Sequence, residues 1–530
     1  MGVMMMITFL PLNKKIQAEQ GISLQEMAQT SGIDTGGICN GRKTCGKCKV
    51  LVSKGNDRRF LAEEEQFLTE EEKARGIRLA CCFYPKEDSC VILERVNAGT
   101  TAASGKNLPV PDALKGASYG VALDIGTTNI EAALYDRQRK VLLQSKGLPN
   151  PQRMYGGDVV SRITFALEDD RNAQKLQKLV KDAANTLIKE LAAGQGISPF
   201  QIDKVVMAGN TTMTNLLLGR SLKDLARAPF QSETYSGIRL NPGEAGLTMH
   251  PGGHAYVLPG ISGHVGGDAL ACILSTELYK EQKKVLLMDI GTNGELVLCD
   301  GNRLITCSAA AGPAFEGGNI SCGMRAEEGA ITSAEYREGQ LTVHFIGEEN
   351  KEASPAGICG SGLIDCICEL YRNGKIDETG RLLGRAGEEN LYRLWEKKGV
   401  EVSITQKDIR EFQLALGAIR AGTAILLEKA GLQAENLDKI YLAGNFGGKL
   451  SVKKAIEVGL LPFVGEDRVE YIGNGVITGG AKVLLEDMSM EEAEDISQRA
   501  EHIELALQPS FEEEFIKAMS FPPRVPLDFE

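Results

Sequence analysis

Four cysteines near the start of the chain have the types and spacing of a group that could hold a metal cluster. Cys39, Cys45 and Cys48 lie in the run CNGRKTCGKC, and Cys81 follows further along the chain. Four thiolates can hold two irons and two sulfides. Glycines at positions 36, 37, 41 and 46 supply backbone that turns tightly and aims amides at sulfur. The pattern therefore predicts a 2Fe–2S cluster, a carrier of single electrons, with these four cysteines as its ligands.

Zinc and free thiols are the alternatives for these cysteines. A zinc site often pairs one C-x2-C with a second C-x2-C, and the chain has no second C-x2-C. The chain has 13 cysteines but no signal peptide and no long apolar span, so disulfides are not expected. Cys82 competes with the adjacent Cys81 as fourth ligand. The segment RLAC, which ends at Cys81, resembles the R-L-x-C segment of adrenodoxin-like ferredoxins and favours Cys81.

The residues around the cysteines are typical of a ferredoxin. The C-x5-C-x2-C spacing is one residue longer in its first gap than the plant-type ferredoxin pattern. The expected elements are strands over 7–10 and 15–18, a helix over 24–29 capped by Ser23, and a strand over 49–52. Residues 61–75 are rich in Glu and predict one surface helix, either simply solvated or a docking site for a basic electron-transfer partner. Residues 1–96 are expected to form a β-grasp 2Fe–2S ferredoxin domain.

Length, charge and apolar content bound the class of protein. With 530 residues the chain is expected to fold into two to four domains. Its net charge of −12 argues against a nucleic-acid partner, because phosphate neutralisation needs a basic face. No run of about 18 apolar residues occurs, so we expect no membrane span and a cytoplasmic location. Residues 97–118 are enriched in Gly, Ala, Ser, Thr and Pro and predict a linker.

Beyond the linker, two short motifs recur in the same order. The run LDIGTTN at Asp124 is repeated as MDIGTNG at Asp289, and VMAGNTT is echoed further on by YLAGNFG. An apolar stretch typical of a buried strand precedes each motif. The repeat predicts two similar α/β halves, residues 119–283 and 284–530, that enclose a cleft suited to a ligand.

The repeated D-I-G-T turns have the chemistry of a phosphate clamp. Glycine lets backbone amides approach an oxyanion, and the threonine hydroxyl donates as well. The carboxylates of Asp124 and Asp289 can each hold a hydrated Mg2+ through one oxygen. The expected phosphate-binding residues are Gly126, Thr127, Thr128, Asn129, Gly291, Thr292 and Asn293. The expected adenosine-binding residues are Gly444, Asn445, Phe446 and Gly447.

Two further carboxylates lie in glycine-rich loops. Asp268 and Glu316 are the candidates to orient an attacking water, alongside Asp124 and Asp289 as catalytic residues, whereas His264 is better interpreted as a supporting or core residue. Each of these loops also has a purely structural interpretation as a turn. The run GNGVITG over 473–479 is one residue off G-x-G-x-x-G and is not expected to bind a dinucleotide.

The three nucleotide motifs, in this order, resemble those of the actin-like ATPase superfamily, which includes acetate and sugar kinases, heat-shock chaperones and actin. The first phosphate motif falls on residues 124–129, the second on 289–293 and the adenosine motif on 444–447. The resemblance implies an RNase H-like fold that binds ATP with Mg2+. The chain is thus expected to be a multidomain protein, with an α+β ferredoxin and a duplicated α/β ATPase.

A ferredoxin, a linker and a duplicated actin-like ATPase in one chain resemble the reductive activators of corrinoid proteins in methyltransferase and O-demethylase systems. The resemblance covers essentially the whole chain. It implies ATP-dependent one-electron reduction of a Co(II) corrinoid to Co(I) through the cluster. The implied partners are the corrinoid protein and an external low-potential electron donor, and a homodimer stays open. The chain lacks D-x-H-x-x-G, so it is not expected to bind a corrinoid by itself.

Other functions remain as alternatives. The chain could be a redox-sensing, ATP-binding regulator, an activator of another low-potential metalloenzyme, or a kinase with a fused ferredoxin. An activator of radical dehydratases would carry a four-iron cluster shared by a homodimer, and the ferredoxin spacing argues against it. Turnover of ATP with and without a corrinoid protein separates the reductive activator from the regulator.

Overall fold

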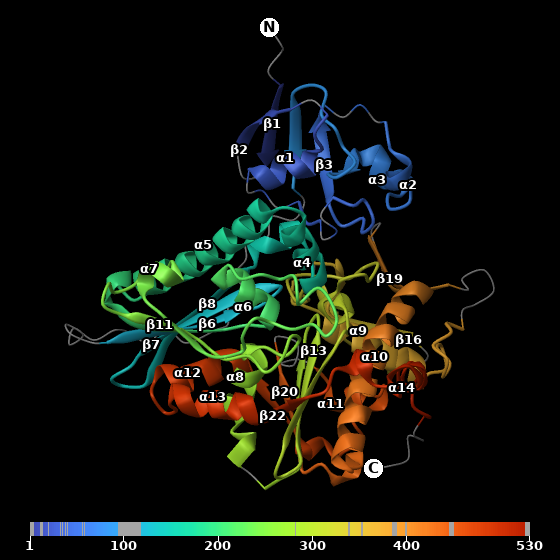
Figure 1. Cartoon of the computed structure of the whole chain (residues 1–530). Coiled ribbons are helices and arrows are strands. Elements are labelled where there is room, and N and C mark those ends of the chain that lie inside the picture. The colour runs from blue at the N-terminus through green and yellow to red at the C-terminus, as the bar shows by residue number, and fades with distance from the viewer. Residues whose placement is uncertain are drawn as a thin grey trace.

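The computed structural model shows a small N-terminal domain on one side of a larger body (Figure 1). It describes residues 5–524 apart from several gaps. The residues outside the description are 1–4, 11–13, 20, 32, 34, 38, 40, 56, 58, 94–117, 281, 338–339, 351–352, 384–389, 398–399, 445–449 and 525–530. The predicted linker over 97–118 therefore lies outside the described residues, except for Ser118.

The N-terminal domain is a mixed sheet with a helix packed on it. Its elements are β1 (Met5–Leu10), β2 (Lys14–Ala18), α1 (Leu24–Thr30), β3 (Lys49–Lys54), α2 (Ala62–Glu65), α3 (Glu70–Arg75), β4 (Ile77–Leu79) and β5 (Ser89–Ile92). The strand order is β2-β1-β5-β3-β4, with β1 antiparallel to β2 and parallel to β5. Ser23 caps α1, because its hydroxyl accepts a hydrogen bond from the Glu26 amide (3.3 Å). This arrangement is the predicted β-grasp ferredoxin fold.

The acidic segment over 61–75 is not one helix, so that prediction was wrong. It forms two short helices, α2 and α3, separated by residues 66–69. Leu68 in this break is buried in the domain core, and Thr69 starts α3 by accepting a hydrogen bond from the Glu72 amide (3.2 Å). An apolar residue that must enter the core and a strong helix cap thus override the helix propensity of the glutamates.

One glutamate of this segment is not solvated at all. The side chains of Glu64 and Arg78 are 0% and 2% exposed, and they form a two-pronged ion pair with N–O distances of 3.0 and 2.7 Å. Glu64 also accepts the amide of Leu79 (3.0 Å). The guanidinium lies against the rings of Phe60 and Phe83. The pair fixes α2 to β4, which leads directly to Cys81.

Replacing Glu64 with alanine is expected to destabilise the cluster domain by about 3 kcal/mol, because the buried guanidinium of Arg78 loses its fully buried partner and keeps the ion pair with the partly exposed Asp57 (3.4 Å). Thermal loss of visible cluster absorbance measures the effect. Glu65→Ala is the matched control, since Glu65 lies on the same helix with an exposed side chain. Equal melting of the two variants would contradict a structural role for the buried pair.

The larger body contains two six-stranded sheets with one shared topology. The first has the order β10-β11-β9-β6-β7-β8 and the second β21-β20-β12-β13-β14-β22. In each sheet an antiparallel three-stranded meander continues into a strand that runs parallel to the first strand of the meander: β9 beside β6, and β20 beside β12. The predicted duplication into two similar halves is confirmed.

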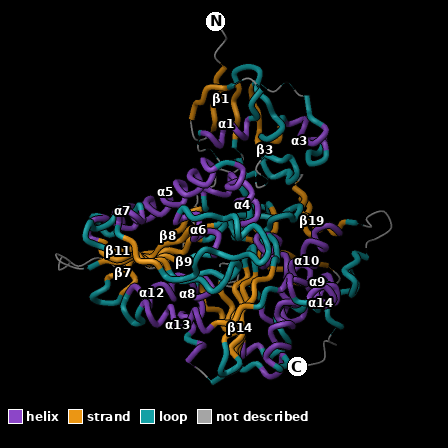
Figure 2. The backbone as a smooth tube through the Cα atoms, in the orientation of Figure 1, coloured by secondary structure: helices purple, strands orange, loops and turns teal. Residues whose placement is uncertain are grey.

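The first half follows the chain from residue 119. Its elements are β6 (Tyr119–Ile125), β7 (Asn129–Asp136), β8 (Val141–Pro149), η1 (Pro151–Tyr155), α4 (Val159–Glu168), α5 (Asp170–Gly194), β9 (Ile202–Ala208), α6 (Thr211–Leu218), β10 (Ile238–Leu240), α7 (Pro242–Ala245), β11 (His254–Val257) and α8 (Gly267–Thr276). The long helix α5 covers the face of this sheet that is turned towards the N-terminal domain (Figures 1 and 2).

The second half carries additional strands around its own sheet. Its elements are β12 (Val285–Ile290), β13 (Gly294–Cys299), β14 (Leu304–Ala309), η4 (Pro313–Glu316), β15 (Ala330–Arg337), β16 (Gln340–Phe345), β17 (Gly357–Ile358), α9 (Gly360–Arg372), β18 (Leu391–Lys397), β19 (Val400–Thr405), α10 (Gln406–Ala430), β20 (Lys439–Ala443), α11 (Val452–Glu457), β21 (Val469–Gly473), α12 (Gly475–Leu484), α13 (Met490–Arg499), β22 (Ala500–His502), η8 (Leu505–Leu507) and α14 (Phe511–Ala518).

Helices α8 and α12 lie between the two sheets and pack on each other. They share one apolar core with both halves: Ala122 and Val206 of the first sheet, Leu287 of the second, and Leu270 and Val483 of the helices. α12 comes from the second half but packs on β6 and β9 of the first. The first turns of these helices therefore lie where the ends of β6 and β12 meet.

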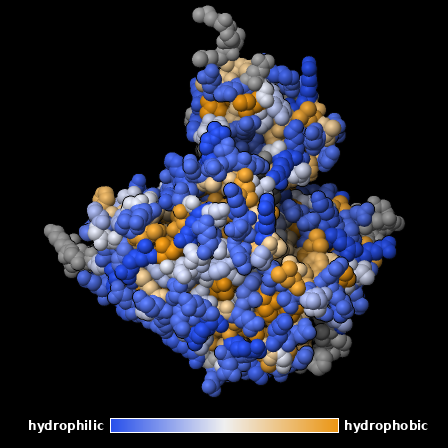
Figure 3. Space-filling view, in the orientation of Figure 1, coloured by the Kyte–Doolittle hydropathy of each residue, from blue (hydrophilic) through white to orange (hydrophobic). Residues whose placement is uncertain are grey.

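The surface agrees with the acidic, mixed composition. Figure 3 shows hydrophilic residues over most of the visible face, with apolar patches among them. Across the part of the chain that the structure describes, no helix combines the length and the apolar character needed to cross a membrane.

Candidate cluster and nucleotide sites

The four predicted cluster ligands form two pairs. The sulfur atoms of Cys48 and Cys81 lie 3.3 Å apart, and Cys39 is hydrogen-bonded to Cys45. Two irons that share four thiolates need two thiolates each. Cys39, Cys45 and Cys48 lie in the loop before β3, and Cys81 lies in the turn after β4. Because β3 and β4 pair with Lys49 opposite Leu79, the loop and the turn lie side by side, and the residues present fit a 2Fe–2S cluster. Their assignment as its ligands stays a proposal.

The thiols differ in how readily they ionise. The hydrogen bond from Cys45 lowers the pKa of Cys39 to about 4, and the hydrogen bond from Cys81 lowers the pKa of Cys48. Burial raises the pKa of Cys82 to about 11, which favours a neutral thiol there. Its sulfur nevertheless lies 3.7 Å from that of Cys81. The geometry thus favours Cys81, which pairs with Cys48, and leaves Cys82 as the alternative to test.

Two features of position 46, in the cysteine loop, require glycine. Its φ is +62°, a left-handed conformation, and a Cβ there would come within 2.6 Å of the Phe67 ring. The predicted role of glycine in letting this loop turn tightly is met most clearly at this position.

The two repeated turns converge on a single carboxylate. Thr128 of the first turn donates a hydrogen bond to one oxygen of Glu316 (2.6 Å), and Thr292 of the second donates to the other (2.9 Å). The two hydroxyls thus lie within reach of one anionic group, although they belong to opposite halves. The predicted role of the two turns as a clamp on a polyphosphate stays a prediction.

Side chains from three other elements hold the first turn. Asn150 donates to the Gly126 carbonyl (2.8 Å), Arg162 of α4 donates to the Thr127 carbonyl (2.5 Å), and Asn210 donates to the Thr127 hydroxyl (2.9 Å). Arg162 is fully buried, and burial lowers its pKa to about 9. A buried cation behind the turn adds to its attraction for an anion. Arg162 was missed in the sequence because no local motif marks it.

Asp124 lies in a group that sequence reasoning did not find. Its carboxylate accepts a hydrogen bond from Asn474 (3.0 Å), and the same amide donates to Glu131 (3.0 Å). Burial, then the charge of Glu131, raise the pKa of Asp124 well above its usual range. Asn474 caps α12, so the glycine-rich run over 473–479 serves this site. Glu131 lies opposite Asp124 in the β6–β7 hairpin, but no sequence pattern near residue 474 marks the contact of Asn474 with this pair.

The second half repeats this arrangement around Asp289. Glu295 pairs with it across the β12–β13 hairpin, as Glu131 does with Asp124. Burial raises the pKa of Asp289 to about 6 and that of Asp268, at the start of α8, to about 7, and the charge of Asp289 contributes to the latter. Cys272 of α8 lies 3.8 Å from the Asp289 carboxylate. Asp124, Asp268 and Asp289 therefore influence one another electrostatically in one buried acidic region, and the charge of Glu316 also acts on Asp289.

This region would hold a divalent cation through water and phosphate. Among the described residues, no three His, Cys, Asp or Glu side chains are grouped closely enough to enclose a metal ion. Mg2+ commonly keeps several waters and binds one or two carboxylates together with substrate phosphates. A site with separate carboxylates at two strand ends fits that preference.

The adenosine motif lies mostly outside the described residues: Asn445, Phe446 and Gly447 are not placed. Gly444 has a φ of +95°, and a Cβ on it would come within 2.9 Å of the Asp289 carboxylate, so glycine is required beside the second turn. Its carbonyl accepts a hydrogen bond from Tyr471 (2.7 Å). The predicted nucleotide-binding role of this motif stays a prediction.

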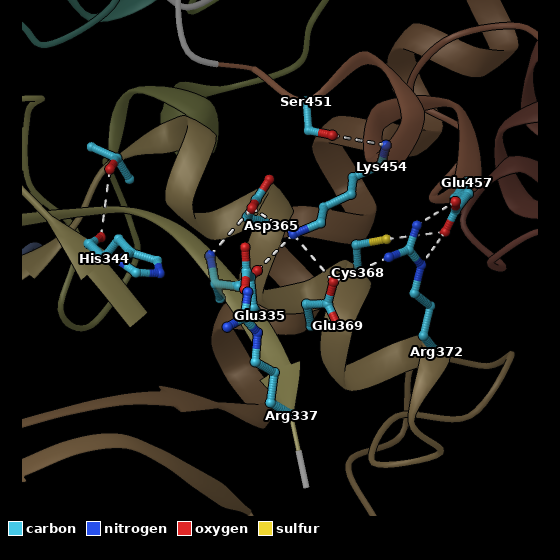
Figure 4. A network of polar contacts seen from close by, with 12 residues as sticks. Glu335, Arg337, His344, Asp365, Cys368, Glu369, Arg372, Ser451, Lys454 and Glu457 are labelled. Carbon is cyan, nitrogen blue, oxygen red and sulfur yellow. Dashed lines mark hydrogen bonds and ion pairs between the residues drawn. The ribbon is translucent and has the colours of Figure 1, made fainter. Parts of the chain in front are cut away.

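A polar network anchors the helix that follows this motif (Figure 4). Lys454 of α11 donates to Asp365 (2.6 Å) and forms an ion pair with Glu369 (3.2 Å), both on α9. Arg372 of α9 forms an ion pair with Glu457 of α11. These contacts fix α11 on α9.

His264 has its partners in two other segments. Its ring nitrogen is 3.1 Å from Glu504, and its ring packs on Phe230. The contact joins the first half to the segment before η8, and the supporting or core role of His264 stays a prediction.

The cluster domain contacts both halves of the body. Gln29 of α1 donates to the Met154 carbonyl and accepts a hydrogen bond from Tyr155 (3.4 Å), both in η1 of the first half. Lys47, between two of the predicted cluster ligands, donates to the carbonyl of Ile320 in the second half (2.8 Å). The cysteine loop therefore lies beside the loop that carries Glu316.

Family models match three consecutive parts of the chain. Residues 7–86 match the 2Fe–2S iron–sulfur cluster binding domain, residues 119–281 the RACo middle region, and residues 283–529 the C-terminal domain of RACo, the ASKHA domain. Together with the fold, these matches define the class: a 2Fe–2S ferredoxin joined to an ATP-binding, actin-like ASKHA module.

Similarity to known proteins narrows the class to a family. The chain is 34% identical over 422 residues to the corrinoid activation enzyme RamQ of Eubacterium limosum, covering 76% of this chain and 70% of that protein. It is 27% identical over 436 residues to the [Co(II) methylated amine-specific corrinoid protein] reductase of Methanosarcina barkeri, covering 76% and 77%. A solved structure, the reductive activator for corrinoid, iron–sulfur protein, matches with a TM-score of 0.68 at 29% identity over 98% of both chains. The chain belongs to the family of reductive activators of corrinoid proteins.

Proposed function

We propose that this protein uses ATP to drive one-electron reduction of a Co(II) corrinoid protein to Co(I). The observation that supports it best is the convergence of Thr128 and Thr292, one from each half, on a single anionic group. Relatives named for corrinoid activation and for Co(II) corrinoid protein reduction supply the substrate class. The proposed partner is a corrinoid protein of a methyltransferase or O-demethylase system.

The body binds ATP with Mg2+ in this proposal. The amides and hydroxyls of the two D-I-G-T turns hold the phosphates, and Asp124 and Asp289 hold the hydrated cation from opposite sides. Asp268 is the candidate to orient the attacking water, since its pKa of about 7 lets it accept a proton near neutral pH. The adenosine contacts fall to Gly444, Asn445, Phe446 and Gly447.

The N-terminal domain carries the electron. A 2Fe–2S cluster supplies one electron at a time, at a potential near −400 mV for plant-type clusters. An external low-potential donor provides that electron, and Co(II) accepts it. The family resemblance implies a still lower potential for the cobalt couple. Transfer against about 120 mV needs about 2.7 kcal/mol, which closure around ATP can supply if it alters the corrinoid environment.

The experiment that tests this function is anaerobic visible spectroscopy of a purified Co(II) corrinoid protein. Reductant, this protein and MgATP together are expected to produce the Co(I) spectrum, and omission of any one is expected to prevent it. Co(I) formation at the same rate without ATP would contradict the proposal. It would favour the alternative of a redox-sensing regulator, in which ATP binding is separate from electron transfer.

A second prediction concerns closure of the body. MgATP is expected to slow proteolysis of residues 119–530 several-fold, because a ligand bound between two halves stabilises their closed arrangement. The linker over 97–118, rich in small residues, is expected to remain the preferred site of cleavage. Limited proteolysis followed by mass spectrometry measures both. An equal digestion pattern with and without MgATP would contradict nucleotide binding between the halves.

A further inference from the structure

We propose that Glu316 is a latch that closes the nucleotide site in the absence of ATP, and that its release by ATP loosens the docking of the cluster domain. The inference rests on the proposed nucleotide site and adds a regulatory role to it. The hydroxyls of Thr128 and Thr292 are expected to donate to phosphate oxygens, but in this structure both donate to Glu316.

The carboxylate of Glu316 is a chemical stand-in for a phosphate at this position. A carboxylate is planar and a phosphate is tetrahedral, but both carry anionic oxygens that accept charge-assisted hydrogen bonds. Thr128 and Thr292 each have a single hydroxyl proton, so neither can donate to Glu316 and to a phosphate at once. Binding of ATP at both turns therefore requires the carboxylate to leave. The latch also joins the two halves, since the threonines belong to different sheets.

Glu316 is part of a compact loop, residues 312–324, here named the latch loop. Backbone hydrogen bonds close it on itself: the Gly318 amide donates to Pro313 (2.8 Å) and the Gly323 amide to Ile320 (3.0 Å). Gly317 has a φ of +75°, and a Cβ on it would come within 2.6 Å of the Met324 carbonyl. The middle of the latch loop, next to Glu316, thus lies against its C-terminal end. A displacement at Glu316 is expected to shift the latch loop as a unit.

The same latch loop carries an anchor of the cluster domain. Lys47 donates to the Ile320 carbonyl (2.8 Å), four residues after Glu316. Lys47 lies between Cys45 and Cys48, so this contact holds the predicted cluster loop itself. The second anchor, from Gln29 to Met154, is on the first half and does not involve the latch loop. Release of Glu316 therefore weakens one anchor and leaves the other, which lets the cluster loop separate from the body while α1 stays attached.

The first test measures nucleotide affinity. Glu316→Ala is expected to bind MgATP about tenfold more tightly than the wild type, because ATP no longer has to displace the carboxylate. Isothermal titration calorimetry on the full chain with its cluster measures this. Glu327→Ala is the control, since Glu327 is an exposed glutamate just beyond the latch loop. Unchanged or weaker binding by Glu316→Ala would overturn the latch.

The second test measures docking by hydrogen–deuterium exchange of peptides that contain residues 41–52. In the wild type, a non-hydrolysable ATP analogue with Mg2+ is expected to speed exchange several-fold. Glu316→Ala and Lys47→Met are expected to exchange fast without nucleotide, and Lys54→Met, an exposed lysine of β3, to match the wild type. Peptides over residues 22–31 are expected to change little, because the Gln29 anchor is retained.

The coupling must act in both directions. If ATP weakens the contact of Lys47 with Ile320, then Lys47→Met must tighten ATP binding by the factor by which ATP weakens that contact. A wild type that binds no ATP would refute the proposed function. A wild type that binds ATP while exchange at residues 41–52 stays constant, with no affinity change in Lys47→Met, would refute the latch alone and leave the function standing.

Discussion

Asp289→Ala is expected to lower ATP-dependent reduction of the corrinoid protein by about a hundredfold or more, while dithionite still reduces the cluster at the normal rate. Asp289 ends β12 beside the second turn, and no described contact joins it to the cluster domain. Its loss removes one side of the proposed cation–phosphate clamp. Asp124→Ala is expected to give the same result from the first half. Glu131 still accepts from Asn474 there, so α12 keeps an anchor.

The appearance of Co(I) under anaerobic conditions measures the effect, and cluster bleaching by dithionite is followed in the same samples. Asp495→Ala is the control, because Asp495 forms an ion pair with Arg499 on the surface of α13. A normal rate of Co(I) formation by Asp289→Ala would show that the ATPase module regulates and does not drive the electron transfer. The redox-sensing regulator would then be the better interpretation.

The parts of the site that the sequence predicted are those with short local spacing. A turn such as D-I-G-T places its glycine and threonine by local geometry alone. The turn occurs twice, at Asp124 and at Asp289, and this repeat predicted the duplication that the two sheets confirm. The β-grasp strands were recognised for the same reason. Local alternation and nearby turn residues suffice to mark them.

The residues that were missed depend on tertiary contacts. Asn474 reaches Asp124 only because α12 crosses from the second half onto the first sheet, and nothing local to residue 474 reports that crossing. Arg162 donates to the carbonyl of Thr127, from which it is separated in the sequence by β7, β8 and η1. The acidic segment over 61–75 was misjudged because composition indicates solvent, whereas Glu64 has a buried guanidinium to neutralise. Buried charges are matched across the fold, so single-sequence patterns cannot locate them.

Cys48→Ser is expected to remove or severely distort the cluster, whereas Cys82→Ser is expected to retain it. The same loss is expected for serine at Cys39, Cys45 and Cys81. Absorbance and the rhombic electron paramagnetic resonance signal after one-electron reduction, with iron and sulfide analysis, measure the outcome. Two irons and two sulfides are expected in the wild type.

The comparison of Cys81→Ser with Cys82→Ser identifies the fourth cluster ligand. Both thiols are buried in the same core, so the loss of a buried sulfur affects packing similarly in the two variants. Only Cys81 pairs with Cys48 at 3.3 Å. If Cys82→Ser alone bleaches the protein, Cys82 is the fourth ligand. In Cys45→Ser, electron transfer is expected to be lost while MgATP still binds, because the two turns that hold the phosphates lie in the body and keep their own contacts.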